Sequence, residues 1–147
     1  MLERLTRLLR IHKKIKLLHL NTGRKETCTV LARRTGDGHT FEVELRTEHD
    51  TMMTVRAEED YEEALQALRV RLEERGLLLL INRYRRNAFV STMARQMSDG
   101  LACYLVQMGR PASPRRIVSS IAPAPARAVV TLREADAFVE QWIDSCN

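Results

Sequence analysis

Residues 84–109, YRRNAFVSTMARQMSDGLACYLVQMG, concentrate the side chains of this chain that are best suited to bind another molecule. Arginine and aromatic residues are interleaved in the first half, and these residue types commonly dominate the energetics of protein interfaces. A basic aromatic loop could also bind phosphate or stack a nucleobase. The candidate binding residues are Tyr84, Arg85, Arg86, Phe89, Ser91, Met93 and Arg95.

The residues most able to perform covalent or metal chemistry are four histidines and three cysteines: His12, His19, His39, His49, Cys28, Cys103 and Cys146. The histidines have no metal-ligand spacing, and the chain contains no HExxH, phosphate-loop or nucleophile-elbow motif. The cysteines are odd in number and far apart, which predicts reduced thiols rather than a zinc site or a disulfide framework. We therefore expect a non-enzymatic protein without metal or cofactor; the alternative is an active site assembled from distant residues.

The length and composition predict one globular domain over residues 1–147. Hydrophobic residues make up 44% of the 147 positions and charged residues 29%, which is ordinary globular usage. No apolar run approaches the roughly 18 residues of a membrane-spanning helix. Basic residues at the N-terminus interleave with leucines instead of preceding an apolar core, which argues against a secretory signal. We expect a cytoplasmic bacterial protein.

The beginning of the chain is strongly basic. Residues 1–25 contain eight Lys and Arg against one acid, Glu3, so this segment is more positive than the whole chain at +5. Leucine and isoleucine recur near helical spacing between positions 2 and 20, which predicts an amphipathic helix at the periphery of the domain. Its leucines could pack on the core, or its basic face could bind nucleic acid or an anionic membrane surface.

Two segments that follow have clear local signatures. Residues 26–34 and 39–46 alternate apolar and polar side chains around a turn containing Asp37 and Gly38, which predicts a hairpin with one solvated face. Residues 51–55 either extend this sheet or lead into the next helix. That helix is predicted over 58–75, with Gly76 as its C-terminal glycine. The acidic residues at its start could simply stabilise the helix by interacting with the helix dipole, or they could form a docking surface for a basic partner.

The rest of the chain alternates short strands and helices. The apolar run at 77–81 predicts the central strand of the sheet, and Ser91 can cap a short helix through Met97. Two further strands are expected at 101–108 and 117–121. A capping box at Thr131 predicts a C-terminal helix that buries Trp142. The expected class is α+β, with a mainly antiparallel sheet of four to five strands packed by two or three amphipathic helices.

The spacing of residues in this half resembles that of a family of small bacterial proteins found beside polymorphic toxin and contact-dependent inhibition loci. The pattern consists of Arg86, Ser91-x-Met93-x-Arg95-x-Met97, Gly100, Ala102, Tyr104, Gly109-Arg110, Phe138, Glu140 and Trp142. It extends over about residues 76–145 and is strongest over 86–109. The resemblance implies an immunity protein that neutralises a toxin by binding its effector domain.

Two functional hypotheses follow. The first is a protein-binding protein, with a toxin domain as its partner, that uses residues 84–97. The second is a basic nucleic-acid-binding module that uses the N-terminal helix and the same arginines. Inhibitors of nucleases are often acidic, and a pI near 9.5 contradicts that expectation unless the acidic segment 58–63 meets the partner. The oligomeric state is not predicted.

Overall fold

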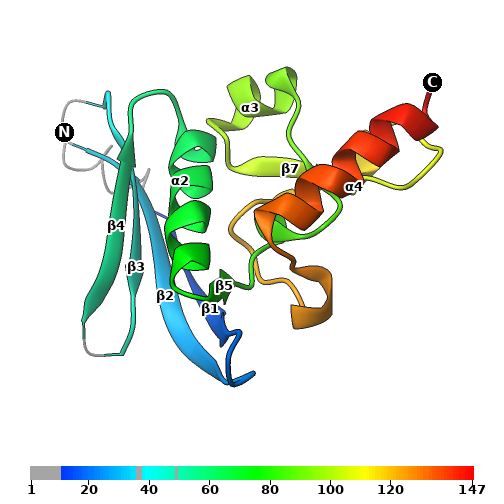
Figure 1. Ribbon diagram of the computed structural model, residues 1–147. Coiled ribbons are helices and arrows are strands. Elements are labelled where there is room, and N and C mark those ends of the chain that lie inside the picture. The colour runs from blue at the N-terminus through cyan, green and yellow to red at the C-terminus, as the bar shows by residue number, and fades with distance from the viewer. Residues whose placement is uncertain (1–10, 36–37, 49) are drawn as a thin grey trace.

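The computed structural model describes residues 11–35, 38–48 and 50–147. Its larger sheet has five strands in the order β4-β3-β2-β1-β5, and each neighbouring pair is antiparallel. The strands are β1 (Ile11–His19), β2 (Lys25–Arg34), β3 (Phe41–Arg46), β4 (Thr51–Ala57) and β5 (Leu77–Leu79). The helix α2 (Tyr61–Glu74) lies across one face of this sheet (Figure 1).

The predicted N-terminal helix is wrong for the part that the structure describes, because residues 11–19 form the strand β1. Ile15 and Leu17 point into the core at 2% and 0% exposure, whereas the neighbouring Lys14 and Lys16 are exposed. Short apolar runs of this kind fit helix and strand periods alike, and tertiary pairing decides between them. β1 pairs with β2 on one side and β5 on the other. Residues 2–10 of the predicted helix lie outside the described residues.

The hairpin of β2 and β3 is confirmed. All six alternating apolar side chains are buried: Cys28, Val30, Ala32, Phe41, Val43 and Leu45. At the turn Gly38 has φ +77°, and its amide donates to the Thr35 carbonyl at 2.7 Å. Asp37 of the predicted turn lies outside the described residues. The strand β4 extends the sheet, as one of the two alternatives predicted.

The opposite face of the hairpin is less solvated than predicted. Glu42 and Glu44 are only 3% and 7% exposed. Glu42 accepts hydrogen bonds from Arg33 at 2.8 Å and Arg56 at 3.2 Å, and Glu44 accepts one from Thr51 at 2.8 Å. These carboxylates can be buried because cross-strand neighbours supply donors and positive charge.

The helix α2 forms where its sequence pattern predicts it. Asp60 caps its start by accepting a hydrogen bond from the Glu63 amide at 2.9 Å, and Gly76 follows its end with φ +72°. Five apolar residues on one side of α2 are buried, and they form the core with the inner face of the sheet: Tyr61, Ala64, Leu65, Leu68 and Leu72.

The apolar run at 77–81 is buried as expected, but the prediction that it forms the centre of the sheet is wrong. β5 is an edge strand next to β1. The proline-containing segment 122–124 covers the outer edge of the chain directly after β5. Ile81 forms a β-bridge with Pro123, and the Ala124 amide donates to the Leu80 carbonyl at 2.9 Å. A covered edge accounts for the continuous apolar sequence.

The second half of the chain forms its own small sheet. Strands were predicted at 101–108 and 117–121, and both form, but a sheet separate from the large one was not predicted. The strands β6 (Ala88–Phe89), β7 (Ala102–Leu105) and β8 (Ile117–Ser119) are antiparallel in the order β6-β7-β8. The short helix α3 (Thr92–Ser98) connects β6 to β7, and the helix α4 (Leu132–Ser145) ends the chain. Three 3-10 turns lie between these elements: η1 (Asn82–Tyr84), η2 (Pro114–Arg116) and η3 (Ala126–Ala128).

The α+β class is confirmed, with an antiparallel five-stranded sheet and three helices in the described residues. In Figure 1, α3 and β7 lie to the right of the upper part of α2, and α4 lies on the side away from the large sheet. Among the described residues, none of the helices is long and apolar enough to span a membrane.

Trp142 fixes α4 to the small sheet. Its side chain is 7% exposed, its ring centroid lies 5.0 Å from that of Phe89, and its Nε1 donates to the Arg110 carbonyl at 2.8 Å. Thr131 is the N-cap of α4, as predicted, because the Glu134 amide donates to the Thr131 hydroxyl. Elsewhere on α4, Ala135 is buried, and Phe138 and Val139 are half-buried.

Replacing Trp142 by alanine should lower the free energy of unfolding by about 3 kcal/mol, because it removes a large buried ring and a hydrogen bond to a backbone carbonyl. Urea unfolding followed by circular dichroism measures this change, since Trp142 is the only tryptophan and its fluorescence disappears with it. Ile143→Ala is the control, with an expected change within about 0.5 kcal/mol because Ile143 is 47% exposed. Equal stability of the two variants would contradict the anchoring role.

Candidate functional site

The structure divides the predicted binding residues between the core, the helix caps and two separate faces. Tyr84 belongs to the core, at 2% exposure. Its hydroxyl donates to the Leu65 carbonyl, and the Arg69 guanidinium lies 4.8 Å from its ring centroid. Burial raises the pKa of Tyr84 well above its ordinary value. Tyr84 is therefore a packing residue, which corrects the expectation that it anchors a partner.

Two other predicted residues position the backbone. The Ser91 hydroxyl accepts a hydrogen bond from the Ala94 amide at 3.1 Å, so Ser91 is the N-cap of α3, as its sequence context predicts. Phe89 packs against Trp142 and is half-buried. These residues hold α3 and α4 in place rather than offering free side chains.

The adjacent arginines Arg85 and Arg86 point to different surroundings. Arg85 Nε donates to Asn82 Oδ1 at 2.8 Å, which closes the turn η1 on itself. The Arg86 amide donates to the Ala128 carbonyl at 2.9 Å, while its guanidinium is exposed and lies 5.3 Å from the Phe138 ring centroid. Only Arg86 of the two extends into an open part of the surface.

Arg95 attaches α3 to the beginning of α2. Its Nη2 donates to Asp60 Oδ1 at 3.1 Å and its Nε to Asp60 Oδ2 at 2.5 Å, and it also forms an ion pair with Glu59 at 3.3 Å. The hydrogen bond from Arg95 to Asp60 raises the pKa of Arg95 above its ordinary value. Since Asp60 is also the N-cap of α2, this single carboxylate joins the starts of two helices.

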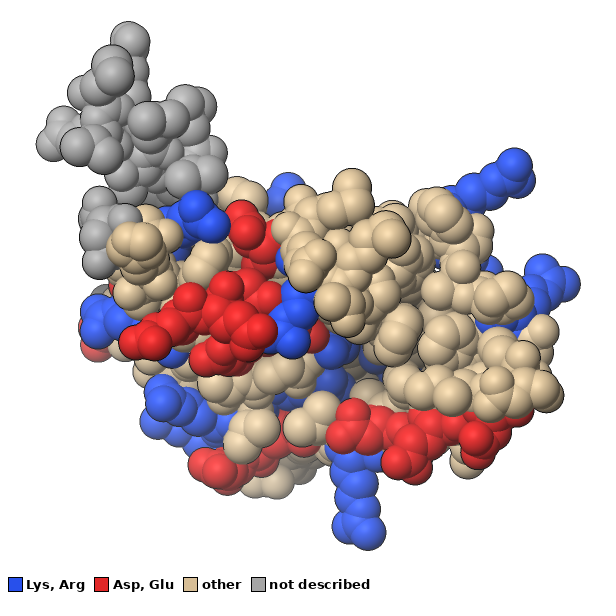
Figure 2. All heavy atoms as spheres, turned by 90° about the horizontal axis from the view of Figure 1, so that it is seen from above, with Lys and Arg blue, Asp and Glu red and all other residues tan. Residues whose placement is uncertain are grey.

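The opposite side of α3 presents two free thioethers. Met93 is 66% exposed and Met97 is 82% exposed, one helical turn apart. The exposed carboxylates at the start of α2 lie on the other side of α3, next to Arg95, and Figure 2 shows acidic side chains gathered next to an area of uncharged side chains on this face. We call this area the α3 surface; it consists of Met93, Met97, Glu58, Glu59 and Glu63.

An ion pair beneath the α3 surface was not predicted. Arg83 donates to both oxygens of Glu62 at 2.7, 3.1 and 2.9 Å, and both side chains are largely buried. The two residues are 21 positions apart, so no local spacing could have revealed the pair. It holds the turn after β5 against α2.

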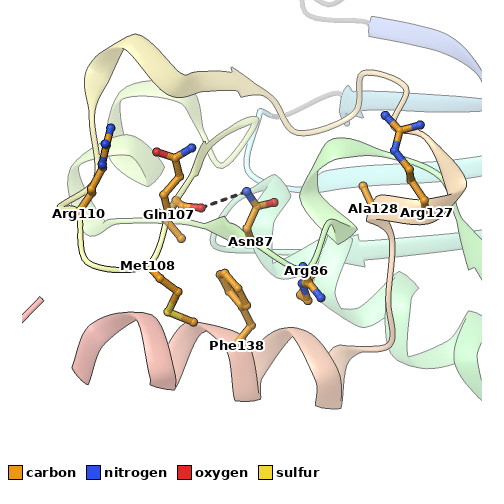
Figure 3. A pocket seen from close by; sticks show the side chains of 9 residues that line it. Arg86, Asn87, Gln107, Met108, Arg110, Arg127, Ala128 and Phe138 are labelled. Carbon is orange, nitrogen blue, oxygen red and sulfur yellow. Dashed lines mark hydrogen bonds between the residues drawn. The ribbon is translucent and has the colours of Figure 1, made fainter. Parts of the chain in front are cut away.

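A groove of about 510 Å³ lies between the residues before β6, the loop after β7, the turn η3 and the helix α4. Its rim carries three exposed arginines, Arg86, Arg110 and Arg127, and its floor is formed in part by Asn87, Gln107 and Phe138 (Figure 3). None of the lining residues is acidic. We call these six residues the arginine groove. Arg110 and Arg127 were not among the predicted site residues.

A signal for the arginine groove is present in the sequence. Residues 100–133 contain no Asp or Glu but carry five arginines, at 110, 115, 116, 127 and 133. An acid-free stretch with several arginines predicts a locally positive surface. Only some of these arginines line the same groove. The packing of α4 determines which ones do, and the sequence alone does not reveal that packing.

The basic residues of β1 do not form the predicted nucleic-acid-binding helix face. Lys16 Nζ donates to the Thr27 hydroxyl at 2.6 Å, and His19 Nε2 lies 2.7 Å from Glu26 Oε1. The strand thus meets polar and acidic neighbours across the sheet. This arrangement gives less support to nucleic-acid binding at β1 than the acid-free lining gives at the arginine groove.

The structure offers no candidate metal site among residues 11–35, 38–48 and 50–147. No group of three or more His, Cys, Asp or Glu side chains there could hold a metal ion. Burial raises the pKa of the Cys28 thiol to about 12 and raises that of Cys103, so neither is a ready thiolate at neutral pH. His49 lies outside the described residues.

Comparison with known proteins gives no family assignment. No model of a known protein family matches the chain, and no curated protein matches it.

Proposed function

We propose that this chain is a non-enzymatic binding protein that contacts another protein through the α3 surface. The observation that carries the proposal is the exposure of Met93 and Met97, at 66% and 82%, one turn apart on the same helix. Methionine side chains at helical spacing either fill core gaps or form adaptable contact surfaces, and such exposure supports the second role.

The α3 surface is held by several independent contacts, which supports a role in recognition. Ser91 caps the helix, Arg95 binds Asp60, and the Ser98 hydroxyl donates to the Ala94 carbonyl at 2.5 Å. A surface fixed before binding loses less conformational entropy when the complex forms. A seven-residue helix with exposed methionines would otherwise be too short to hold its shape.

The charge around the methionines indicates the kind of partner. Glu58, Glu59 and Glu63 are exposed at the start of α2, next to α3. Carboxylates on one side of an apolar patch favour a partner that carries basic residues beside an apolar pocket, because opposite potentials steer association. A contact through these carboxylates is compatible with the high pI of the whole chain.

The resemblance of residues 76–145 to immunity proteins supplies the identity of the partner in this proposal. The partner is the effector domain of a bacterial toxin, which the protein neutralises by binding it in the cytoplasm. Arg85, Tyr84, Phe89 and Ser91 support the fold of the binding region, and Met93, Met97 and the nearby acids make the contact.

Replacing Met93 and Met97 together by aspartate should weaken partner binding about tenfold or more, because the partner then meets two carboxylates in place of two central apolar side chains. The binding is measured by affinity capture of the tagged protein from its native lysate after nuclease treatment, followed by titration with the captured protein. Ile143→Asp is the matched control, since Ile143 is an exposed apolar residue on α4 away from α3.

The toxin assignment has its own test. Co-expression with the captured protein's effector domain should protect cells from growth arrest, and the Met93→Asp, Met97→Asp variant should fail to protect them. Equal capture by the variant and the wild type would show that the α3 surface does not bind the partner. Recovery of nucleic acid alone, released on addition of salt, would contradict the whole proposal.

A further inference from the structure

We infer that the arginine groove binds single-stranded nucleic acid, at a site separate from the α3 surface. The groove has a volume of about 510 Å³ and no acidic residue in its lining. In the described part of the chain, the guanidinium groups of Arg86, Arg110 and Arg127 have no carboxylate partner. Arg83 and Arg95 are half-buried and each is paired with a carboxylate, whereas these three arginines are exposed and free to receive an anion.

The arrangement of the charges favours a linear polyanion over a small anion. Figure 3 places Arg110 at one end of the groove and Arg127 at the other, with Arg86 between them. A site for a single phosphate would bring its donors together around one point. Arginines distributed along a hollow instead fit successive phosphates of one strand, since each planar guanidinium can hold one phosphate with two hydrogen bonds.

The floor of the groove favours nucleotides over acidic peptides. Phe138 lies between Arg86 and Gln107 in Figure 3, and its half-buried ring is the aromatic element of the lining. Single-stranded nucleic acid commonly binds in basic grooves where bases meet aromatic side chains. The Asn87 and Gln107 amides add donors and acceptors for base edges, and Asn87 is held by its Nδ2 hydrogen bond to the Val106 carbonyl at 3.1 Å.

The shape of the site favours a single strand over a duplex. A protein reads duplex DNA by inserting a helix or a β-ribbon into the major groove. The lining residues here form a groove in the protein surface beside α4. The nucleic acid therefore has to lie in a groove of the protein, and no protein element is inserted into a groove of the nucleic acid. A chain with unpaired bases can follow such a hollow.

The test uses the full-length protein and a fluorescein-labelled oligouridylate, with anisotropy as the measure of binding. The variant Arg86→Gln, Arg110→Gln, Arg127→Gln should bind at least tenfold more weakly. The slope of log affinity against log salt should become shallower by about 0.7 for each phosphate that the variant no longer neutralises. Single replacement of Arg127, which is exposed, keeps the test valid if the triple variant does not fold.

The matched control is Arg115→Gln, Arg116→Gln, Arg133→Gln. It removes the same charge from the same acid-free segment, but none of its residues lines the groove. We expect its affinity to fall less than threefold. Phe138→Leu should weaken binding about fivefold or more with the salt slope unchanged, because stacking involves no counterion release.

Several outcomes would overturn the inference. Equal weakening of the groove and control variants would mean that net charge alone attracts the oligonucleotide. Stronger competition by polyglutamate, by inorganic phosphate or by a duplex of the same length would assign the groove to a different ligand. Absence of binding by the wild type at low salt would remove the site altogether.

Discussion

Replacing Gly100 by alanine should lower the free energy of unfolding by about 4 kcal/mol. Gly100 has φ +84°, a left-handed conformation that costs any residue with a Cβ. A Cβ added there would lie 2.4 Å from the Glu62 amide nitrogen and 2.8 Å from Glu62 Cβ. Because the first of these atoms belongs to the backbone of α2, the clash is relieved only if α3 and α2 move apart.

The control for this prediction is Gly109→Ala. Gly109 has φ +76°, but an added Cβ would meet nothing within 4 Å. Its cost should therefore be the conformational one alone, about 1 kcal/mol. Urea unfolding of both variants separates the backbone contribution from the steric one. If the two variants were equally stable, the close contact between residue 100 and α2 would have no effect on the free energy of unfolding.

Replacing Arg69 by alanine should also lower the free energy of unfolding by about 4 kcal/mol, because it breaks a buried charged network. Arg69 is 2% exposed, and burial lowers the pKa of its guanidinium. Its Nη2 donates to the Tyr84 carbonyl at 3.3 Å and the Val130 carbonyl at 2.8 Å, and its Nε donates to Glu73 at 3.2 Å.

The network containing Arg69 connects α2 to the second half of the chain. Glu73, its partner, also accepts hydrogen bonds from the amide of Leu132, the first residue of α4, at 3.2 and 3.0 Å. Loss of Arg69 leaves two carbonyls and one carboxylate without a shared donor. Amide hydrogen exchange should therefore accelerate in α4 more than in β2 and β3.

Arg71→Ala is the matched control, because Arg71 is exposed on the same helix and should change stability by less than about 0.5 kcal/mol. Arg69→Met retains most of the apolar stem and separates packing from hydrogen bonding. If Arg69→Met were as stable as Arg71→Ala, the hydrogen bonds from the guanidinium to the carbonyls would be energetically neutral.

The chain has a net charge of +5, but its surface contains two regions of opposite charge. The α3 surface includes exposed carboxylates at the start of α2 as well as the two methionines, whereas the arginine groove has no acid in its lining. The two proposed ligands are therefore separable. Variants at Met93 and Met97 should leave oligonucleotide binding unchanged, and variants of the arginine groove should leave capture of the protein partner unchanged.

The elements that could be predicted from the sequence are those whose signals are local. The β2–β3 hairpin follows from strict alternation around a glycine turn, and α2 from an apolar stripe ended by Gly76. The caps at Ser91 and Thr131 follow from the hydrogen bond that each hydroxyl accepts within its own first turn. In all these cases the residues that decide the structure lie within a few positions of one another.

The candidate site was predictable only in part. Residues 84–97 do contain the exposed methionines and Arg86, but Tyr84 is a core residue and Arg95 is held by Asp60. Residue type alone cannot tell a free arginine from a paired one, because the carboxylate that pairs with Arg95 is 35 positions away. Arg110 and Arg127 become one site only when α4 packs beside them.

The α+β class, the hairpin, the three helices and the caps at Ser91 and Thr131 could be predicted because each depends on side chains that are neighbours along the chain. The strand at residues 11–19, the edge position of β5 and the set of arginines that are free to bind a ligand depend on tertiary contacts and could not be predicted. Strand pairing, burial and ion pairing join residues far apart in the sequence, and their free energy exceeds the small local preferences of the segments they connect.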